Sequence, residues 1–253
     1  MHDFEGRSII VTGAASGIGN AIATHLANQG AFIGIFDLNA EGATEAAAAI
    51  MRDGGRATTT VIDITDYQAV SEAVAEFNQQ HGPLYGLVNN AGWDEAKNFS
   101  DTNPAFWQKV IDINLYGPLN MTHSACRHMA QQGEGRVVSI ASDAGRVGSS
   151  GEAVYSAAKG GTIALMKTLA REYARQGITF NSVCPGPTDT PLLASFDASS
   201  GGKLAPALAR AVPMRRLAQP TDFPKVVEMF LHPVSEYITG QTISVSGGLS
   251  MHG

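Results

Sequence analysis

Short β-forming runs alternate with longer, alanine-rich, helix-favouring stretches along the whole chain. Strands that are connected through helices in this way form parallel sheets. Strands buried on both faces read as continuous apolar runs, as residues 9–11 and 32–36 do. The sequence therefore predicts an α/β fold, a doubly wound parallel sheet with helices on both faces. Strands are expected at 8–12, 31–36, 58–63, 85–89, 136–141, 179–184 and 242–245, and helices at 18–29, 40–52, 67–80, 104–129, 153–176 and 221–231.

The length of 253 residues approaches the upper limit of what one hydrophobic core supports, so one domain over residues 1–253 is expected. A hydrophobic fraction of 44% supplies the material for such a core. The segment 187–216 fits this pattern poorly, because it carries four prolines and only a weak helical pattern. It follows the carboxyl end of an expected strand, where ligands bind such sheets, so we expect it to form a substrate lid.

The net charge of −6 argues against nucleic acid or an anionic membrane as the main partner. No apolar run approaches the roughly 18 residues of a membrane span, and Asp3 and Glu5 leave no room for a cleavable signal before the first strand. The two cysteines form neither a C-x-x-C pair nor a disulfide framework. A cytoplasmic protein is expected. The histidine spacings predict no metal site.

A glycine-rich turn joins the first expected strand to the first helix, with the sequence Thr12-Gly13-Ala14-Ala15-Ser16-Gly17-Ile18-Gly19. Glycines let backbone N–H groups approach a phosphate without a Cβ in the way. The helix N-terminus adds unpaired donors and a partial positive charge. The spacing is one residue longer than the common dinucleotide fingerprint, and the motif alone also fits an ordinary strand-to-helix turn.

Asp37 ends the second expected strand. In a dinucleotide-binding unit, a carboxylate at this place binds the adenosine ribose hydroxyls and repels a 2′-phosphate. The cofactor predicted is therefore NAD rather than NADP. Alternatively, Asp37 only opens the turn before the next helix.

Tyr155 and Lys159 stand four residues apart in a strongly helical segment, so their side chains share one face. A phenol with its ordinary pKa near 10 is a poor base at neutral pH, but a nearby ammonium lowers that pKa. The pair is a candidate for acid/base chemistry, although this spacing also arises by chance.

Further motifs follow the glycine turn in a fixed order. They are Asp63, Asn89-Asn90-Ala91-Gly92, Asn114, Ser142, Tyr155-x-x-x-Lys159, Pro185-Gly186, Gly240 and Gly247-Gly248. With these motifs the sequence resembles the short-chain dehydrogenase/reductase family over essentially its whole length. The resemblance implies a single-domain Rossmann-type fold and an enzyme that transfers a hydride between a nicotinamide cofactor and a small-molecule secondary alcohol or ketone.

The resemblance also implies roles for individual residues. Tyr155 would be the general acid/base, Lys159 would lower its pKa and bind the nicotinamide ribose, and Ser142 would bind the substrate oxygen. Asn114 would hold a water that relays protons to Lys159. The implied cofactor-binding residues are Gly13, Ser16, Gly17, Ile18, Gly19, Asp37, Leu38, Asp63, Ile64, Asn90, Ala91, Gly92, Tyr155, Lys159, Pro185, Gly186, Thr188 and Thr190.

Several of these residues have plainer explanations. Ser142 could be a helix cap, Asn114 could satisfy backbone groups within a helix, and Asn89-Asn90 could form a strand-ending turn. The family resemblance implies a homotetramer built from the paired helices 104–129 and 153–176. Two consecutive glycines, Gly160 and Gly161, predict close packing of another element against the second of these helices.

Three loops are expected to select the substrate: 93–99, 143–153 and the lid. The predicted substrate residues are Trp93, Asp94, Ser142, Asp143, Arg146 and Glu152. In residues 89–94, 142–155 and 184–193 the chain resembles one branch of the family, the bacterial 2-hydroxycyclohexanecarboxyl-CoA dehydrogenases. This likeness implies oxidation of an alicyclic or short-chain hydroxyacyl-CoA.

Lys203, Arg210 and Arg215 could meet the phosphates of coenzyme A or form a solvated face of the lid. The alternative functions are a 3-oxoacyl-carrier-protein reductase, a simple secondary-alcohol dehydrogenase and, in another class, a non-catalytic dinucleotide-binding regulator. Asp37 argues against the first, because such biosynthetic reductases usually use NADPH. The substrate's identity, its stereochemistry and the physiological direction stay open.

Overall fold

Seven strands form one parallel sheet in a computed structural model that describes residues 3–199 and 201–251. The strand order is β3-β2-β1-β4-β5-β6-β7. The predicted doubly wound sheet is confirmed, and the first and last strands match their predicted bounds. The strands are β1 (Ser8–Thr12), β2 (Phe32–Asp37), β3 (Arg56–Val61), β4 (Leu84–Asn89), β5 (Gly135–Ile140), β6 (Ile178–Pro185) and β7 (Thr242–Val245).

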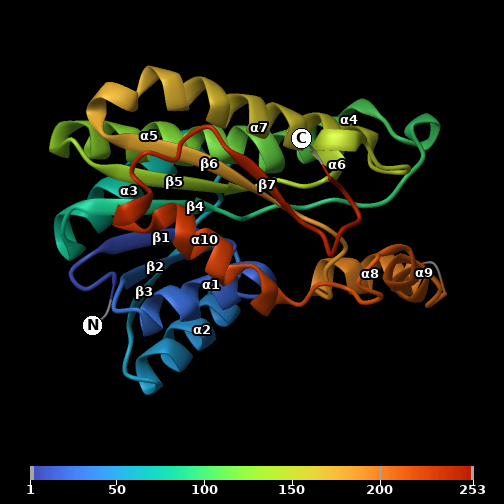
Figure 1. The fold of residues 1–253 in the computed structure, drawn as a ribbon, viewed down its shortest axis with the longest axis horizontal. Coiled ribbons are helices and arrows are strands. Elements are labelled where there is room, and N and C mark those ends of the chain that lie inside the picture. The colour runs from blue at the N-terminus through green and yellow to red at the C-terminus, as the bar shows by residue number, and fades with distance from the viewer. Residues whose placement is uncertain (1–2, 200, 252–253) are drawn as a thin grey trace.

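Helices cover both faces of this sheet (Figure 1). Helices α1, α2 and α10 pack one apolar core against it, and α3, α5 and α7 pack the other. Because both faces are covered, the strands carry continuous apolar runs instead of alternating ones. The helices are α1 (Gly17–Asn28), α2 (Ala40–Arg52), α3 (Tyr67–His81), α4 (Pro104–Ile111), α5 (Gly117–Gln132), α6 (Ala144–Val147), α7 (Ala153–Glu172), α8 (Pro191–Ser199), α9 (Leu204–Ala211) and α10 (Pro224–Leu231).

Strand β1 is the point at which the strand order reverses. It pairs with β2 on one side and with β4 on the other. The chain therefore leaves β1 and β4 in opposite directions, which opens a crevice beyond their carboxyl ends. Ligands of doubly wound sheets bind in this crevice.

The expected helix 104–129 is interrupted by a π-helical turn at Asp112–Tyr116, between α4 and α5. The side-chain amide of Asn114 donates to the carbonyl oxygen of Val110 at 2.9 Å. In a regular α-helix this carbonyl would accept from the backbone N–H of Asn114, so the side chain competes with the helical pattern. Such turns occur frequently at functional sites.

The segment 187–216 is largely helical, although its sequence has only a weak helical pattern. Helices α8 and α9 extend from one end of the sheet (Figure 1). Pro191 begins α8 and Pro206 lies in the first turn of α9, where a missing N–H costs no helical hydrogen bond. The prolines therefore start these helices instead of breaking them. The backbone N–H of Ala205 donates to Oδ1 of Asp197 at 3.0 Å and joins the two helices.

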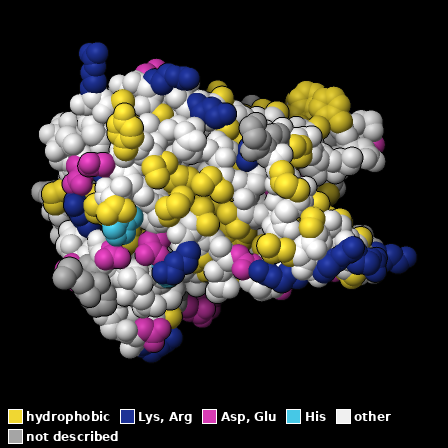
Figure 2. Space-filling model, in the orientation of Figure 1, with side chains coloured by type: hydrophobic (Ala, Val, Ile, Leu, Met, Phe, Trp, Pro, Cys, Tyr) yellow, Lys and Arg dark blue, Asp and Glu magenta, His cyan; other side chains and the backbone are white. Residues whose placement is uncertain are grey.

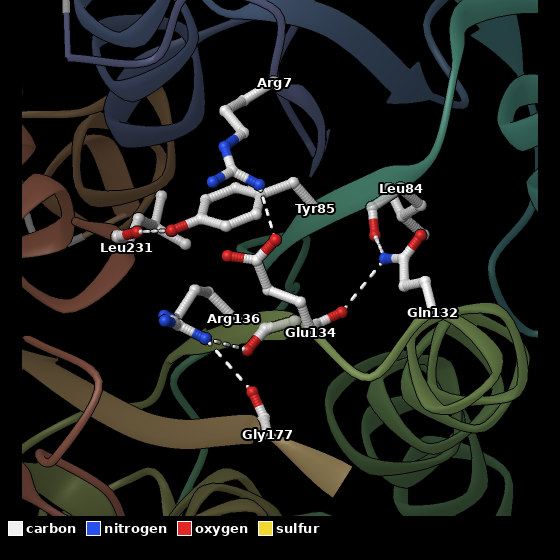
Figure 3. A network of polar contacts seen from close by, with 9 residues as sticks. Arg7, Leu84, Tyr85, Gln132, Glu134, Arg136, Gly177 and Leu231 are labelled. Atoms are coloured by element: carbon white, nitrogen blue, oxygen red, sulfur yellow. Dashed lines mark hydrogen bonds and ion pairs between the residues drawn. The ribbon is translucent and has the colours of Figure 1, made fainter. Parts of the chain in front are cut away.

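A polar network fixes the opposite, amino-terminal end of the sheet (Figure 3). Arg7 Nη1 donates to Glu134 Oε2 at 2.6 Å, and its guanidinium lies 4.2 Å from the centroid of the Tyr85 ring. Arg136 is 3% exposed and donates to the carbonyl oxygen of Gly177 at 3.2 Å. These contacts link residues at the starts of β1, β4, β5 and β6. The network stabilises the end of the fold that lies away from the crevice.

Across the described residues, every helix is too short or too polar to span a bilayer. The same residues hold no group of three or more His, Cys, Asp and Glu side chains placed to bind a metal ion.

Candidate active site

A cavity of about 1540 Å³ opens at the carboxyl ends of the strands. Residues that follow each of the strands β1 to β6 contribute to its wall, as expected for a ligand site in a doubly wound sheet. Most of the predicted site residues are brought together there. Those on the wall are Gly13, Ser16, Gly17, Ile18, Asp37, Leu38, Asp63, Ile64, Asn90, Ala91, Gly92, Trp93, Ser142, Asp143, Glu152, Tyr155, Lys159, Pro185, Gly186, Thr188 and Thr190.

Four predicted residues lie outside this set of described wall residues: Gly19, Asp94, Asn114 and Arg146. Gly19 lies behind the glycine turn, where a Cβ would collide with the carbonyl oxygen of Gly13 and with the side-chain amide of Asn90. Its role is therefore to allow close packing within the turn.

The glycine turn approaches the loop after β4 closely. Gly13 has a φ of +64°, and a Cβ on it would lie 2.7 Å from Cα of Ala91. Asn90 Nδ2 donates to the carbonyl oxygens of Thr12 and Gly13, both at 3.0 Å. These contacts hold the turn in place. Within the described chain, Ser16 at the N-cap of α1 makes no side-chain capping bond, so the first backbone N–H groups of α1 remain available to an anion.

The carboxylate of Asp37 accepts two backbone hydrogen bonds. Oδ2 accepts from the N–H of Ala15 and Oδ1 from that of Asn39, both at 2.9 Å. Asp37 thus does open the turn, which was the alternative to ribose binding. Each oxygen keeps a further lone pair and Asp37 lies on the cavity wall, so the two roles are compatible.

The loop after β3 forms a further part of the wall. Asp63 Oδ1 accepts from the N–H of Thr65 at 2.9 Å and from its hydroxyl at 2.7 Å. Asn120 on α5 donates to the carbonyl oxygen of Ile64 at 2.9 Å. These bonds fix the loop that carries Asp63 and Ile64.

Lys159 lies at the base of the cavity, 3% exposed, and its Nζ donates to the carbonyl oxygen of Ile140 at 2.9 Å. Nζ is 5.5 Å from the centroid of the Tyr155 ring. Burial lowers the pKa of Lys159 to about 8. The predicted pair therefore does share one wall of the cavity.

The pKa of Tyr155 is raised, whereas the sequence predicted that Lys159 lowers it. Burial raises its pKa above the ordinary value, the charges of Glu152 and Asp94 add to the increase, and a hydrogen bond with Ser142 opposes it. The expected decrease of the Tyr155 pKa by Lys159 is not observed in the chain alone, where burial disfavours the phenolate more strongly than the hydrogen bond with Ser142 stabilises it. Ser142 also caps its own turn, since its Oγ accepts from the N–H of Ala144 at 3.1 Å.

Asn114 is fully buried behind Gly92. A Cβ on Gly92 would lie 2.9 Å from Oδ1 of Asn114 and 3.4 Å from Nζ of Lys159. The side chain of Asn114 bonds to backbone groups, which was the alternative to a role in proton relay. The backbone carbonyl oxygen of Asn114 accepts from the hydroxyl of Thr162 at 3.1 Å. Gly92 therefore permits Asn114 and Lys159 to lie close together.

The predicted substrate residues of the loop 143–153 lie in two different places. Glu152 and Asp143 lie on the cavity wall. Arg146 instead donates from Nη1 to Oγ of Ser244 on β7 at 2.8 Å, and that hydroxyl also bonds Oδ1 of Asp143. Arg146 thus ties the loop to β7 and lies outside the described residues of the cavity wall.

The consecutive glycines of α7 pack against other elements, as predicted. A Cβ on Gly145 of α6 would lie 2.7 Å from the backbone nitrogen of Gly160, and one on Gly161 would lie 3.3 Å from Cδ1 of Leu115. Both partners belong to the same chain. The glycines therefore serve the internal packing of α6 and the π-turn on α7.

Two parts of the wall consist of residues that were not assigned from the sequence. Lys109 on α4 lies on it, with Nζ 3.6 Å from the centroid of the Trp93 ring. An apolar surface from α8 and α9 is the other part. The spacing of Leu192, Leu193 and Phe196, one helical face, was the available signal. The apolar surface consists of Leu192, Leu193, Phe196, Leu204 and Leu208.

The chain is similar to characterised oxidoreductases over nearly its whole length. A family model described as enoyl-(acyl carrier protein) reductase matches residues 13–250. A cis-4-hydroxycyclohexanecarboxylate dehydrogenase of Sinomonas cyclohexanicum is 37% identical over 97% of each chain, and an acetoacetyl-CoA reductase of Synechocystis sp. is 34% identical over 96% of each. A crystal structure of an actinorhodin polyketide ketoreductase variant with NADPH has a TM-score of 0.93 and 31% identity, covering 100% of this chain and 99% of that one.

Proposed function

The chain belongs to the short-chain dehydrogenase/reductase family and is an oxidoreductase acting on CH–OH groups, and from this premise we propose that it uses NAD to oxidise an alicyclic or short-chain hydroxy acid, carried as its coenzyme A thioester. One observation carries the reaction: Ser142, Tyr155 and the buried Lys159 lie on the wall of the same cavity as the glycine turn. Acid/base groups and a phosphate cradle in one cavity are what hydride transfer requires.

The residues present fit a dinucleotide. The close approach of Gly13 to Ala91 and the free donors at the start of α1 support pyrophosphate binding, and Asp37 supports binding of the adenosine ribose. Asp63 and Ile64 would flank the adenine. When bound, the nicotinamide supplies the carbon that accepts or returns the hydride.

The chain's own residues move the proton. In oxidation, the substrate C–H bond gives up a hydride while the hydroxyl proton passes to the Tyr155 phenolate, leaving a carbonyl. Ser142 would bind the reacting oxygen. Lys159 keeps two N–H donors beyond its bond to Ile140, enough to bind ribose hydroxyls and to stabilise the phenolate. The side chain of Asn114 is already bonded to backbone groups. The backbone carbonyl oxygen of Asn114 would therefore hold the relay water.

The preference for NAD rests on charge. Asp37 places a carboxylate where NADP would carry its 2′-phosphate. Among the described residues of the cavity wall, the only cations are Lys109 and Lys159. A 2′-phosphate near Asp37 would therefore meet a negative group with no basic neighbour on the wall to compensate it.

Two surfaces support the proposed substrate. The apolar wall of α8 and α9, together with Trp93, suits a ring or a short acyl chain, and one relative at 37% identity is named for a hydroxycyclohexane carboxylate. Figure 2 shows Lys and Arg side chains along the edge of the α8–α9 extension, where they would attract the coenzyme A phosphates. Arg215 is already partly engaged, since its Nη1 donates to the carbonyl oxygen of Arg210 at 2.6 Å.

A second candidate is a 3-oxoacyl thioester reductase, which the similarity to an acetoacetyl-CoA reductase favours. The test is to measure turnover of hydroxyacyl and oxoacyl thioesters with NAD, NADH, NADP and NADPH. We expect NAD and NADH to be strongly preferred. A preference for NADPH in reduction would support the second candidate.

Tyr155→Phe tests the chemistry, because it removes the proton-transfer hydroxyl and keeps the ring. Turnover should collapse while NAD binding, followed by fluorescence quenching, persists. A variant that keeps a tenth of the parental turnover would show that the acid/base group lies elsewhere.

We also propose a cytoplasmic homotetramer formed through α5 and α7. Hydrophobic side chains gather on the surface in Figure 2 over β7 and α10, and the chain near these elements exposes Val234, Tyr237 and Ile243. A tetramer needs a second contact besides the one through α5 and α7, and this exposed apolar patch would supply it.

A further inference from the structure

Asp94 is buried beside the proposed reacting groups without lying on the cavity wall. It is 4% exposed, and within the described part of the chain its Oδ2 atom has no hydrogen-bond partner. A buried carboxylate oxygen without a partner costs free energy and calls for an explanation beyond packing.

Glu152 lies next to both Asp94 and the main cavity. It lines a small hollow together with Asp94, and it also lies on the wall of the main cavity. The loops that carry them are joined by a backbone hydrogen bond from Lys97 to Gly151 at 2.9 Å. Tyr155 follows Glu152 by one turn at the start of α7. The loop that carries Asp94 is therefore tied to the loop that leads into Tyr155.

The charged groups around Asp94 come from two elements. Its own loop supplies Glu95 and Lys97, which form an ion pair with each other at 2.9 Å. Helix α7 and its N-cap supply Glu152, Tyr155 and Lys159. The part of the hollow formed around α4 is uncharged; its lining residues there are Phe99, Thr102 and Phe106.

We propose that Asp94 is a positioning residue for the proton on Tyr155: when ionised, its carboxylate opposes the formation of the Tyr155 phenolate, and Glu152 reinforces it. This inference rests on the proposed function, in which Tyr155 is the acid/base group. Asp94 acts through its field and does not touch the substrate. Its charge keeps the proton on Tyr155, which favours proton donation to a carbonyl over proton removal from an alcohol.

The ionisation of Asp94 falls in the working range of pH. Burial raises its pKa to about 7, with the charges of Glu152 and Glu95 adding, while the N–H of Glu95 and the charge of Lys159 oppose the increase. Below that pH the carboxyl is neutral and its effect on Tyr155 vanishes. Above it the charge is present and the phenolate is disfavoured. The effect of Asp94 should therefore depend on pH in a way that a purely structural residue cannot imitate.

The test compares the parent with Asp94→Asn, which keeps the shape and stays neutral at every pH. The measurement is kcat/KM for NAD-dependent alcohol oxidation between pH 5.5 and pH 9.5. The two proteins should agree below pH 6, and the variant should become faster above pH 7, by about twofold or more at pH 8.5. Glu152→Gln should shift the profile in the same direction and is the second variant if Asp94→Asn does not fold.

A readout other than activity separates the possible outcomes. The absorbance of tyrosinate, taken as the difference between each protein and its Tyr155→Phe counterpart with NAD bound, should rise at lower pH in Asp94→Asn than in the parent. A rate change by the same factor at all pH values, with an unchanged tyrosinate titration, would overturn the proposal and leave Asp94 a structural residue. Retained turnover in Tyr155→Phe would instead overturn the proposed function itself.

Discussion

The side-chain amide of Asn114 holds the backbone of Trp93 at both of its polar groups. Nδ2 donates to the carbonyl oxygen of Trp93 at 2.6 Å, and Oδ1 accepts from its N–H at 3.3 Å. A residue within a distorted helix thus fixes the loop after β4, and with it Gly92 on the cavity wall and the buried Asp94. The position of the loop depends on one amide.

Asn114→Ala should therefore lower activity and stability together. It leaves backbone groups of Trp93 without partners at a buried site, which costs about 1–3 kcal/mol. We expect kcat to fall at least tenfold, with a lower midpoint in urea. Asn181→Ala is the matched control, because Asn181 is equally buried and also holds two backbone groups, the carbonyl of Ile238 and the N–H of Gln241. It should lose stability while keeping most of its kcat.

Lys159→Met should impair both NAD binding and turnover. The ammonium is proposed to serve the ribose and the phenolate, whereas the Tyr155 hydroxyl serves the proton alone. NAD affinity measured by calorimetry should therefore fall in Lys159→Met and stay near the parental value in Tyr155→Phe. Equal NAD affinity in both variants would contradict a ribose contact by Lys159.

Asp37→Ser should narrow the preference for NAD over NADP. Removing the carboxylate relieves its repulsion of a 2′-phosphate, which is on the order of 1–3 kcal/mol. The ratio of kcat/KM with NAD to kcat/KM with NADP should therefore fall about tenfold or more. Asp66→Ser is the control, because Asp66 caps α3 by accepting from the N–H of Ala69. The ratio should be unchanged in that variant. Comparable efficiency with NADP in the parent would refute the assignment to Asp37.

A hydroxyacyl-CoA and its free hydroxy acid form a matched pair of substrates. If the thioester is the substrate, kcat/KM should be at least tenfold higher for it, equivalent to about 1.4 kcal/mol. Lys203→Ala combined with Arg210→Ala should reduce that gain, most clearly at low salt. Lys167→Ala, an exposed lysine on α7, should leave it unchanged. A gain below tenfold would favour a simple alcohol or hydroxy-acid dehydrogenase.

Asp94→Asn should raise the thermal stability of the fold at alkaline pH. The pKa of Asp94 lies at about 7 in the folded chain and near 3.8 when unfolded, so the carboxyl's contribution to stability is fully present below pH 3.8 and is lost as the pH rises through 7. The variant has no such loss. Its Tm should exceed that of the parent above pH 7, and the difference should shrink as the pH falls toward 4. A constant difference would mean that Asp94 does not titrate near 7.

The sheet follows from local patterns, with strand ends predicted to within two residues, whereas most of the cavity wall was predicted through the family resemblance. Helix α2 begins where the sequence predicts, because Asn39 caps it by accepting from the N–H of Gly42. The π-turn could not be predicted, because it depends on what Asn114 contacts outside its own helix. The place of Arg146 outside the cavity wall could not be predicted for the same reason, since its partner Ser244 lies 98 positions further along the chain.

Helix α8 illustrates a different limit. The spacing of Leu192, Leu193 and Phe196 indicates one helical face, but Pro191 and the following glycines suggested an irregular segment. Whether a proline breaks a helix or starts one depends on where the first turn falls, and that boundary is the least certain part of any reading from sequence.

The π-turn also determines how the side-chain faces of α4 and α5 are rotated relative to each other around the helix axis. One extra residue in a turn rotates everything after it by about 100° around the helix axis, because each residue of an α-helix advances by that angle. Helix α4 directs Ala105 and Lys109 to the cavity, whereas α5 directs Met121 and Ala125 to the core beneath the sheet. Deleting one residue between 112 and 116 would restore a regular helix and turn the apolar face of α5 away from that core. The length of this turn is therefore fixed by the packing of α5 against the sheet.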